Sequence, residues 1–301
     1  MIYKQWTEDD VQYIKENYQN KTYAEIGAFL GRSEGSIRLK IHHLGLKKSV
    51  YHCNYDFFDN IDNEEKAYWL GFIFADGNIN KALSTLTINL QGNDKNHLVK
   101  FNKSIHGNFP VTVFNEQHGD KPYRMCKILV YSTKMAKDLY VKGVVPNKTK
   151  NMVMPELPSN LIRHFIRGYF DGDGCICEHK KKKRESVIDC SFVSGSKAFI
   201  DALRKVLFDN DIKSYIQPVN NSIDSVRLTM SGLLQPDKFL HYIYDNATIY
   251  LERKFNKKNK LYEELHIEQR LLRQAEKSGS FNLSEKENGN PEMEIRVEGC
   301  M

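Results

Sequence analysis

The first 50 residues carry apolar side chains at the three- and four-residue spacing of short amphipathic helices. This spacing predicts three helices, which begin near Thr7, Tyr23 and Ser33. Thr7 and Ser33 can cap a helix N-terminus, and Gly31 can adopt the left-handed conformation that ends a helix. The apolar positions are Val11, Ile14 and Tyr18, then Ile26, Phe29 and Leu30, and finally Ile37, Ile41 and Leu44. Three short helices with a tight turn before the last one predict a helix-turn-helix unit over residues 1–50.

Further along the chain, short runs alternate apolar and polar side chains, which is typical of half-buried strands. The chain repeats itself once, over 62–157 and 158–266, and each copy reads as helix, two strands, helix, two strands, helix. The clearest predicted strands are 86–90, 188–192 and 226–230, and the clearest following helices are 94–106 and 196–209. We therefore expect an α+β fold of two pseudo-symmetric αββαββα halves with antiparallel sheets, preceded by the small all-α unit.

Two segments lie outside this repeat. Residues 51–61 are short and polar-aromatic, and we interpret them as a linker. Residues 267–301 are expected to be a flexible tail, because from about residue 277 the sequence is acidic and lacks a periodic apolar face.

Each copy opens with a helix that ends in Asp-Gly, with the strings AYWLGFIFADG at 67–77 and HFIRGYFDGDG at 164–174. Each string holds two small residues four positions apart, which places them on one face of the helix. Two such faces allow two helix backbones to approach closely. The small pairs are Gly71 with Ala75 and Gly168 with Gly172.

If the two helices pack in parallel, Asp76 and Asp173 arrive together at their C-terminal ends. A carboxylate at the negative end of a helix dipole costs about 0.3–1 kcal/mol, and two neighbouring carboxylates repel each other. A bound divalent cation would reverse both penalties, and Mg²⁺ prefers such oxygen ligands together with substrate phosphates. The alternative is that Asp-Gly merely closes a helix in a turn. The recurrence of the motif 97 residues later favours the metal site.

The charge distribution points to a polyanionic partner. The formal net charge is +6, and residues 268–301 hold five basic and seven acidic residues, which leaves +8 on residues 1–267. On the predicted third helix, basic side chains could reach phosphates or base edges in a major groove. These side chains are Arg38, Lys40, His42 and His43. The alternative is a small helical bundle with a solvated charged face.

The segment WTEDDVQYIKENYQNKTYAEIGAFLGRSEGSIRLKIHHLGL resembles Myb-like helix-turn-helix DNA-binding domains. The two motif strings resemble the LAGLIDADG motif of homing endonucleases, and their two-copy layout is similar to the monomeric members of that family. This second resemblance covers roughly 62–266. It implies that the two halves form a DNA-binding saddle, and that a monomer binds a long, partly pseudo-palindromic site in double-stranded DNA.

The resemblance also implies site residues. The last acidic residue of each motif, Asp76 or Asp173, would bind the catalytic Mg²⁺ or Mn²⁺. Asp171 matches a variable position, which Phe74 occupies in the first copy, so we expect no catalytic role for Asp171.

Each half of a homing endonuclease of this type also supplies a basic residue near its last helix. Such a residue would polarise the attacking water or offset charge on the phosphorane. Lys148 and Lys254 match that place best, and Lys150 and Arg253 are alternatives. A surface salt bridge would explain either lysine equally well.

Further DNA contacts are expected from the second half. The run that follows its motif helix would contact phosphates, unless it is simply a solvated loop. The run comprises Lys180, Lys181, Lys182, Lys183 and Arg184. Arg227, on a predicted strand, is a further candidate for DNA contact.

Together these features predict a site-specific double-strand DNA endonuclease that hydrolyses one phosphodiester per strand and serves intron or intein mobility. A non-catalytic DNA-binding transcription regulator on the same scaffold and an RNA-splicing maturase are the alternatives. The six cysteines lack CxxC spacing, so we expect free thiols in a reducing compartment. No run of 18 apolar residues and no signal peptide is present, so we expect no membrane association and a cytoplasmic location in a bacterial or phage-infected cell.

Overall fold

The computed structural model describes residues 5–19, 21–46, 51–118, 121–146, 151–179, 186–219 and 224–277. These residues divide into two compact units. One unit contains the described residues up to Lys66 together with Asp76–Pro146, and the other contains Ala67–Ala75 together with the described residues from 151 onward. The predicted boundary between the two halves lies between residues 157 and 158, which differs from this division. The difference arises because most of the first motif helix packs with the second half.

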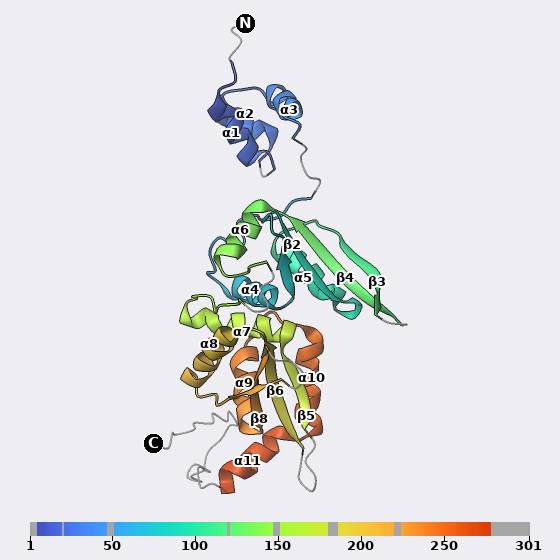
Figure 1. Ribbon diagram of the computed structural model, residues 1–301, viewed down its shortest axis with the longest axis vertical. Helices are drawn as coiled ribbons and strands as arrows, with labels where there is room; N and C mark the ends of the chain where they lie inside the picture. The colour runs from blue at the N-terminus through green and yellow to red at the C-terminus, as the bar shows by residue number, and fades with distance from the viewer. Residues whose placement is uncertain are drawn as a thin grey trace, which may run out of the picture. The chain divides into compact units, whose positions relative to one another are not determined.

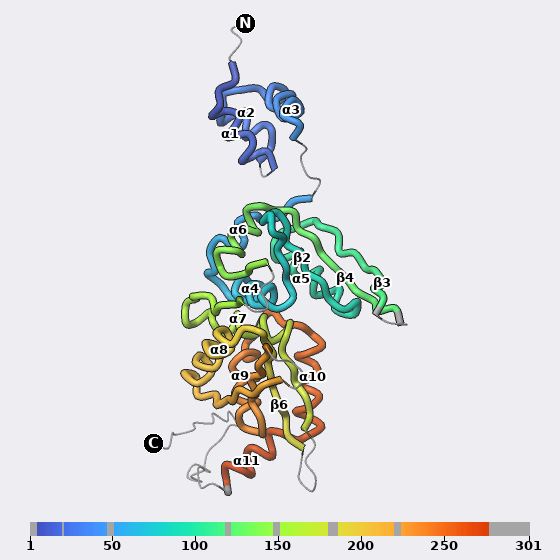
Figure 2. Tube along the Cα trace, viewed as in Figure 1, coloured from blue at the N-terminus to red at the C-terminus, as the bar shows by residue number. Residues whose placement is uncertain are grey.

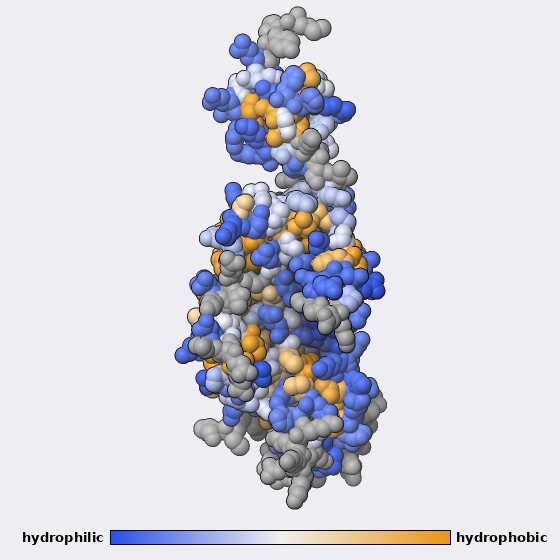
Figure 3. All heavy atoms as spheres, turned by 45° about the vertical axis from the view of Figure 1, so that its right-hand side comes forward, coloured by the Kyte–Doolittle hydropathy of each residue, from blue (hydrophilic) through white to orange (hydrophobic). Residues whose placement is uncertain are grey.

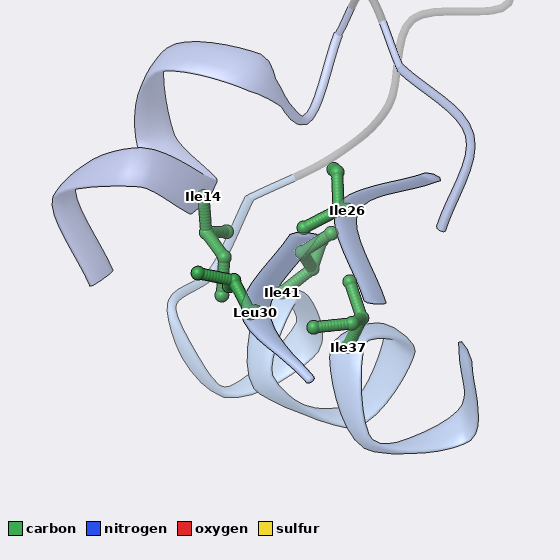
Figure 4. Packing of buried hydrophobic residues seen from close by; sticks show 5 residues of the cluster. All are labelled: Ile14, Ile26, Leu30, Ile37 and Ile41. Atoms are coloured by element: carbon green, nitrogen blue, oxygen red, sulfur yellow. The ribbon is translucent and has the colours of Figure 1, made fainter. Parts of the chain in front are cut away.

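Three helices form at the N-terminal end, as the apolar spacing predicts (Figure 1). They are α1 (Glu8–Asn17), α2 (Tyr23–Leu30) and α3 (Glu34–His43). Thr7 and Thr22 each form a capping box, Ser33 caps α3, and Gly31 ends α2 at a positive φ of 64°. Figure 4 shows the aliphatic side chains that meet between the helices, which are Ile14, Ile26, Leu30, Ile37 and Ile41.

Residues 51–59, which were predicted to be a linker, contact the first half. Phe57 and Phe58 are 4% and 0% exposed. The Asn54 N–H donates to the Ile105 carbonyl at 2.6 Å, and the Lys142 Nζ donates to the Asp59 carbonyl at 2.7 Å. The two phenylalanines supply apolar surface that must be buried, which a count of polar residues overlooks.

The first half has the predicted order of elements. Its helices are α4 (Glu64–Asp76), α5 (Lys95–Ser104) and α6 (Thr133–Val141), with a short 3-10 helix η1 (Gly92–Asp94) before α5. Its strands are β1 (Gly77–Ile79), β2 (Thr85–Gln91), β3 (Val111–His118) and β4 (Lys121–Tyr131). They form an antiparallel sheet of order β1-β2-β4-β3, in which Ile88 pairs with Ile128.

The second half repeats this order. Its helices are α7 (Ser159–Asp173), α8 (Lys197–Asp209) and α9 (Leu234–Tyr244). Its strands are β5 (Cys175–His179), β6 (Val187–Ser194), β7 (Tyr215–Pro218) and β8 (Val226–Gly232). The sheet order is β5-β6-β8-β7, which matches the first sheet strand for strand. Figure 2 traces the chain through both halves. The predicted α+β fold is confirmed, whereas the saddle stays a prediction.

Two more helices follow, α10 (Glu252–Glu264) and α11 (Ile267–Lys277). The prediction of a flexible tail from residue 267 is therefore wrong as far as residue 277. Ile267 is 1% exposed, and the Arg270 Nη1 donates to the Ser186 carbonyl at 2.7 Å. These two contacts anchor α11, and the remainder of the predicted tail lies outside the described residues.

No helix in the described part of the chain is long and apolar enough to cross a membrane. On the face shown in Figure 3, hydrophobic residues lie scattered among hydrophilic ones. Five cysteines are free thiols, as predicted, and Cys300 lies outside the described residues.

Candidate active site

Within one compact unit, Ala67–Ala75 of α4 packs backbone to backbone against α7. A Cβ added at Gly71 would lie 1.9 Å from the Phe165 carbonyl oxygen, and one added at Gly168 would lie 1.9 Å from that of Tyr68. Only glycine fits at either position. Each glycine faces the carbonyl three residues before the other glycine, so the contacts are symmetric about a local twofold axis. The predicted close approach of the motif helices is confirmed.

Asp76 and Asp173 are the last residues of α4 and α7. Asp76 is half-buried and Asp173 is exposed. At Gly174, which follows α7, a Cβ would lie 2.1 Å from the Phe170 ring, so the chain can leave the helix there only through glycine. The helix α7 therefore ends directly after Asp173, whose carboxylate is accessible to solvent. The role of both aspartates as metal ligands stays a prediction.

The Asp173 carboxylate at the end of α7 suits a hard cation, because carboxylate oxygens are among the ligands that Mg²⁺ prefers. Among the described residues, no group of three or more His, Cys, Asp and Glu side chains could hold a metal ion by itself. Mg²⁺ is commonly held by one or two carboxylates, with substrate phosphates and water completing its shell. Asp76 and Asp173 each offer a carboxylate of this kind, and their sharing of one cation stays a prediction.

Lys254 lies in the first turn of α10 and is only 6% exposed. Its Nζ donates to three main-chain carbonyls at the end of α7, those of Phe170, Gly172 (3.2 Å) and Gly174 (2.5 Å). It also lies 5.2 Å from the centre of the Phe170 ring. A surface salt bridge, the alternative considered for this lysine, does not describe a buried side chain. Its catalytic role stays a prediction.

Asp171 is fully buried beside this lysine. Its Oδ1 accepts a hydrogen bond from the Tyr244 hydroxyl at 2.6 Å. Its Oδ2 accepts from the Tyr68 hydroxyl at 2.8 Å and from the Leu251 N–H at 2.7 Å. Burial raises the pKa of Asp171, although its hydrogen-bond donors and the Lys254 ammonium oppose that shift. The sequence analysis assigned no role to this residue. The signal was its partner position Phe74, an apolar residue that marks the position as buried.

Arg167 is a second buried polar residue that sequence reasoning missed. It is 0% exposed, and it donates through Nε to the Ile249 carbonyl at 2.9 Å and through Nη1 to the Ile243 carbonyl at 2.8 Å. These bonds fasten the end of α9 and the segment that follows it to α7. A charged residue within a motif gives no sequence signal of burial, because arginine is mostly exposed in proteins.

The predicted DNA contacts of the N-terminal unit lie along α3. Arg38, His42 and His43 are exposed, and the Arg38 Nη2 pairs with Glu34 at 3.0 Å. Lys40 is half-buried, with its Nζ 5.3 Å from the centre of the Trp6 ring. The three helices are confirmed, whereas the Myb-like identity and the DNA contact stay predictions.

The second sheet has one face that turns away from α8 and α9. Ile188, Cys190 and Phe192 are buried on the helix side, and the alternation of β-strands places polar side chains on the opposite side. There Asp189 Oδ2 lies 3.1 Å from His179 Nδ1, and Asp189 Oδ1 accepts from the Ser231 hydroxyl at 2.5 Å. The polar side chains on this side, from the alternation and register, are Cys175, Cys177, His179, Asp189, Ser191, Gln217, Arg227, Thr229 and Ser231, and Val187, Val193 and Tyr215 share it. Ser191 and Thr229 are buried. Arg227 is exposed there.

Several predicted basic residues lie outside the described residues. They are Lys148 and the run Lys180, Lys181, Lys182, Lys183 and Arg184. The run falls in the sequence between β5 and β6, which pair antiparallel from His179 and Val187 onward.

One known family model matches most of the second half. Residues 160–244 match the family model described as a LAGLIDADG-like domain. The matched segment runs from α7 to the end of α9, so it includes the second motif helix and the whole second sheet. Residues 160–244 are therefore similar to a LAGLIDADG-like domain, the family that the motif strings resemble.

Individual relatives are distant. The replication factor C small subunit of Methanocaldococcus jannaschii is 25% identical over 249 residues, which are 75% of this chain but only 13% of that protein. Full-length DUF199/WhiA from Thermatoga maritima has a TM-score of 0.44 and 18% identity, with 75% of this chain and 74% of that chain covered. The LAGLIDADG homing endonuclease I-LtrWI bound to target DNA has a TM-score of 0.45 and 12% identity, with 76% and 99% covered.

Proposed function

We propose that the chain is a divalent-metal-dependent, site-specific DNA endonuclease. The observation that carries the proposal is a repeated helix that ends in an acidic residue behind a glycine contact face. Asp173 ends the helix that opens the LAGLIDADG-like domain, and Asp76 ends the equivalent helix 97 residues earlier. A carboxylate at a helix C-terminus is electrostatically unfavourable, so its recurrence is best explained by a bound cation.

The chemistry would be phosphodiester hydrolysis. Asp76 and Asp173 would hold Mg²⁺ or Mn²⁺, and the cation, when bound, would supply Lewis acidity and lower the pKa of attacking water. The carboxylates would fix the position of the cation beside the scissile phosphates. Lys148 and Lys254 are the basic candidates that the resemblance supplies, and no covalent nucleophile is required.

The proposed partner is double-stranded DNA with a long, partly pseudo-palindromic site, bound by a monomer. The net charge of +6 supports a polyanionic partner. The polar face of the second sheet supports it further, because a β-ribbon with hydrogen-bonding side chains can read base edges in a major groove. The exposed basic residues of α3 would add contacts from the N-terminal unit.

A library experiment tests the proposal. The full chain is incubated with random-sequence duplex DNA and Mg²⁺, or with EDTA in a matched sample, and both bound and newly ended molecules are sequenced. We expect Mg²⁺-dependent ends on both strands within one family of related sites. Enrichment of bound duplex without new ends would identify a non-catalytic regulator. In a parallel incubation with structured RNA, binding of the RNA in place of duplex DNA would identify a maturase.

A further inference from the structure

At the end of α7 and the start of α10, each helix supplies a charged side chain that bonds to the main chain of the other. Asp171, in the last turn of α7, accepts the N–H of Leu251, the residue that caps α10. Lys254, in the first turn of α10, donates to the last carbonyls of α7. The negative side chain thus meets the positive end of one helix dipole, and the positive side chain meets the negative end of the other.

The geometry points to a reciprocal lock in which Lys254 and Asp171 hold the Asp173 carboxylate in place, with Lys254 acting as a positioning residue. This inference rests on the proposed function, since it names how the metal-binding acid of the second half is fixed. We define the Asp171–Lys254 lock as these two side chains with their main-chain partners.

The hydrogen-bonding capacity of Lys254 supports a positioning role. An ammonium group has three N–H donors and no acceptor, and Lys254 Nζ contacts three carbonyl oxygens. Two of these carbonyls, those of Gly172 and Gly174, belong to the residues on either side of Asp173. Lys254 therefore fixes the backbone around Asp173, and its donors are engaged before any water or phosphate arrives.

Asp171 supports the lock from the opposite side. Its two oxygens accept from two tyrosine hydroxyls and one N–H, and none of its surface reaches solvent. Two buried opposite charges stabilise each other, and removing one partner leaves the other uncompensated. The first half has Phe74 at the position of Asp171, and Phe74 packs its ring 5.1 Å from that of Phe165. The first motif helix therefore lacks the acidic member of the lock.

The decisive variant is Lys254→Met, which keeps an unbranched chain of similar length and removes the three donors. Lys260→Met, one and a half turns further along α10, is the matched control, because Lys260 is 71% exposed and pairs only loosely with Glu264 at 3.6 Å. Asp171→Asn/Lys254→Met removes both charges, and the Asn side chain can still accept from Leu251 while its NH₂ group donates to Tyr244.

The first readout is hydrogen exchange of the full chain without metal. The Gly174 N–H bonds to the Phe170 carbonyl at 2.8 Å, so it reports on the last turn of α7. We expect Lys254→Met to speed exchange across Gly172–Ile176 by tenfold or more, and Lys260→Met to leave it unchanged. Unchanged exchange in a folded Lys254→Met protein would overturn the lock. If that protein does not fold, the double variant is measured in its place, with the same expectation.

The second readout separates positioning from direct catalysis. Partners that orient a metal ligand typically contribute 10–100-fold to metal affinity or activity. We expect Lys254→Met to raise the concentration of Tb³⁺ needed for half-maximal luminescence, and of Mg²⁺ needed for half-maximal cleavage, at least tenfold. Saturating Mg²⁺ should restore most of the rate, with the shape of the pH profile retained. A rate that saturating Mg²⁺ fails to restore, or a lost limb of the pH profile, would make Lys254 catalytic and overturn the inference.

The exchange measurement distinguishes this inference from the proposed function. Absence of cleavage by the unmodified chain would refute the nuclease and leave the hydrogen-exchange result to decide the lock by itself.

Discussion

Gly168→Ala is the smallest change that tests the glycine contact between the motif helices. The new Cβ would lie 1.9 Å from the Tyr68 carbonyl oxygen, 2.8 Å from the Phe72 nitrogen and 2.9 Å from the Tyr68 carbonyl carbon. All three atoms belong to backbone, so no side chain can rotate away. An ordinary contact of at least about 3.4 Å requires the two helices to separate locally by roughly 1.5 Å.

This separation is costly because the residues around the contact are fully buried. Overpacking typically costs about 1–3 kcal/mol and occasionally more, and a backbone-to-backbone clash belongs at the upper end. Because alanine has a higher helix propensity than glycine, the substitution also stabilises the helix by at most about 1 kcal/mol. We therefore expect a net loss of about 2–3 kcal/mol. For a unit of this size, that loss lowers the melting temperature by roughly 4–12 °C.

Thermal unfolding followed by circular dichroism measures the effect. Gly35→Ala is the matched control, because Gly35 lies in α3 with nothing within 4 Å of its added Cβ, and the same substitution there should stabilise the helix slightly. If Gly168→Ala melts at or above the temperature of the unmodified chain, the two helices do not meet along this face.

Three further outcomes follow from the described residues. Asp237 and Asp245 raise the pKa of His241 to about 9. The stability that His241→Gln removes should therefore be fully present below about pH 6.5 and lost as the pH rises through about 9. Urea titrations across pH 5–10 measure this loss, which should be modest because the His241 side chain is 47% exposed. Deletion of residues 1–50 should leave cleavage in place while flattening the slope of log K against log salt by about 0.9 per lost phosphate contact, as fluorescence anisotropy would show. Arg227→Gln should lower DNA affinity with no change in melting temperature, and an equal affinity would remove Arg227 from the DNA interface.

Periodicity was sufficient to predict most of the fold. The three N-terminal helices and the repeated order of elements follow from local spacing, because they depend on residues close together in the sequence. The contact at Gly71 and Gly168 joins distant segments, but the small-residue faces that form it are also visible in local spacing. The burial of Phe57 and Phe58 was missed because the polar residues around them predicted a linker. The helix α11 was missed although Ile267, Leu271 and Ala275 have helical spacing.

The candidate site likewise has residues that sequence spacing could identify and residues that it could not. Asp76 and Asp173 could be singled out because they recur at fixed spacing, and the structure adds that each ends its helix. The positions of Lys254, Asp171 and Arg167 could not be predicted, because their partners lie about 75–85 residues away in the sequence. Sequence spacing therefore identified the acids and left the residues that hold them in place to be found in three dimensions.

The most direct test of the central claim replaces each motif acid in turn. Asp76→Asn and Asp173→Asn keep the side-chain shape and remove the charge that would hold the cation. Asp209→Asn is the control, because Asp209 also ends a helix and is exposed. Cleavage of a cognate duplex is followed with Mg²⁺, and duplex binding is followed with Ca²⁺. The account predicts that Asp76→Asn and Asp173→Asn each abolish double-strand cleavage while binding persists, and that Asp209→Asn cuts normally. Normal cleavage by both Asp76→Asn and Asp173→Asn would contradict it.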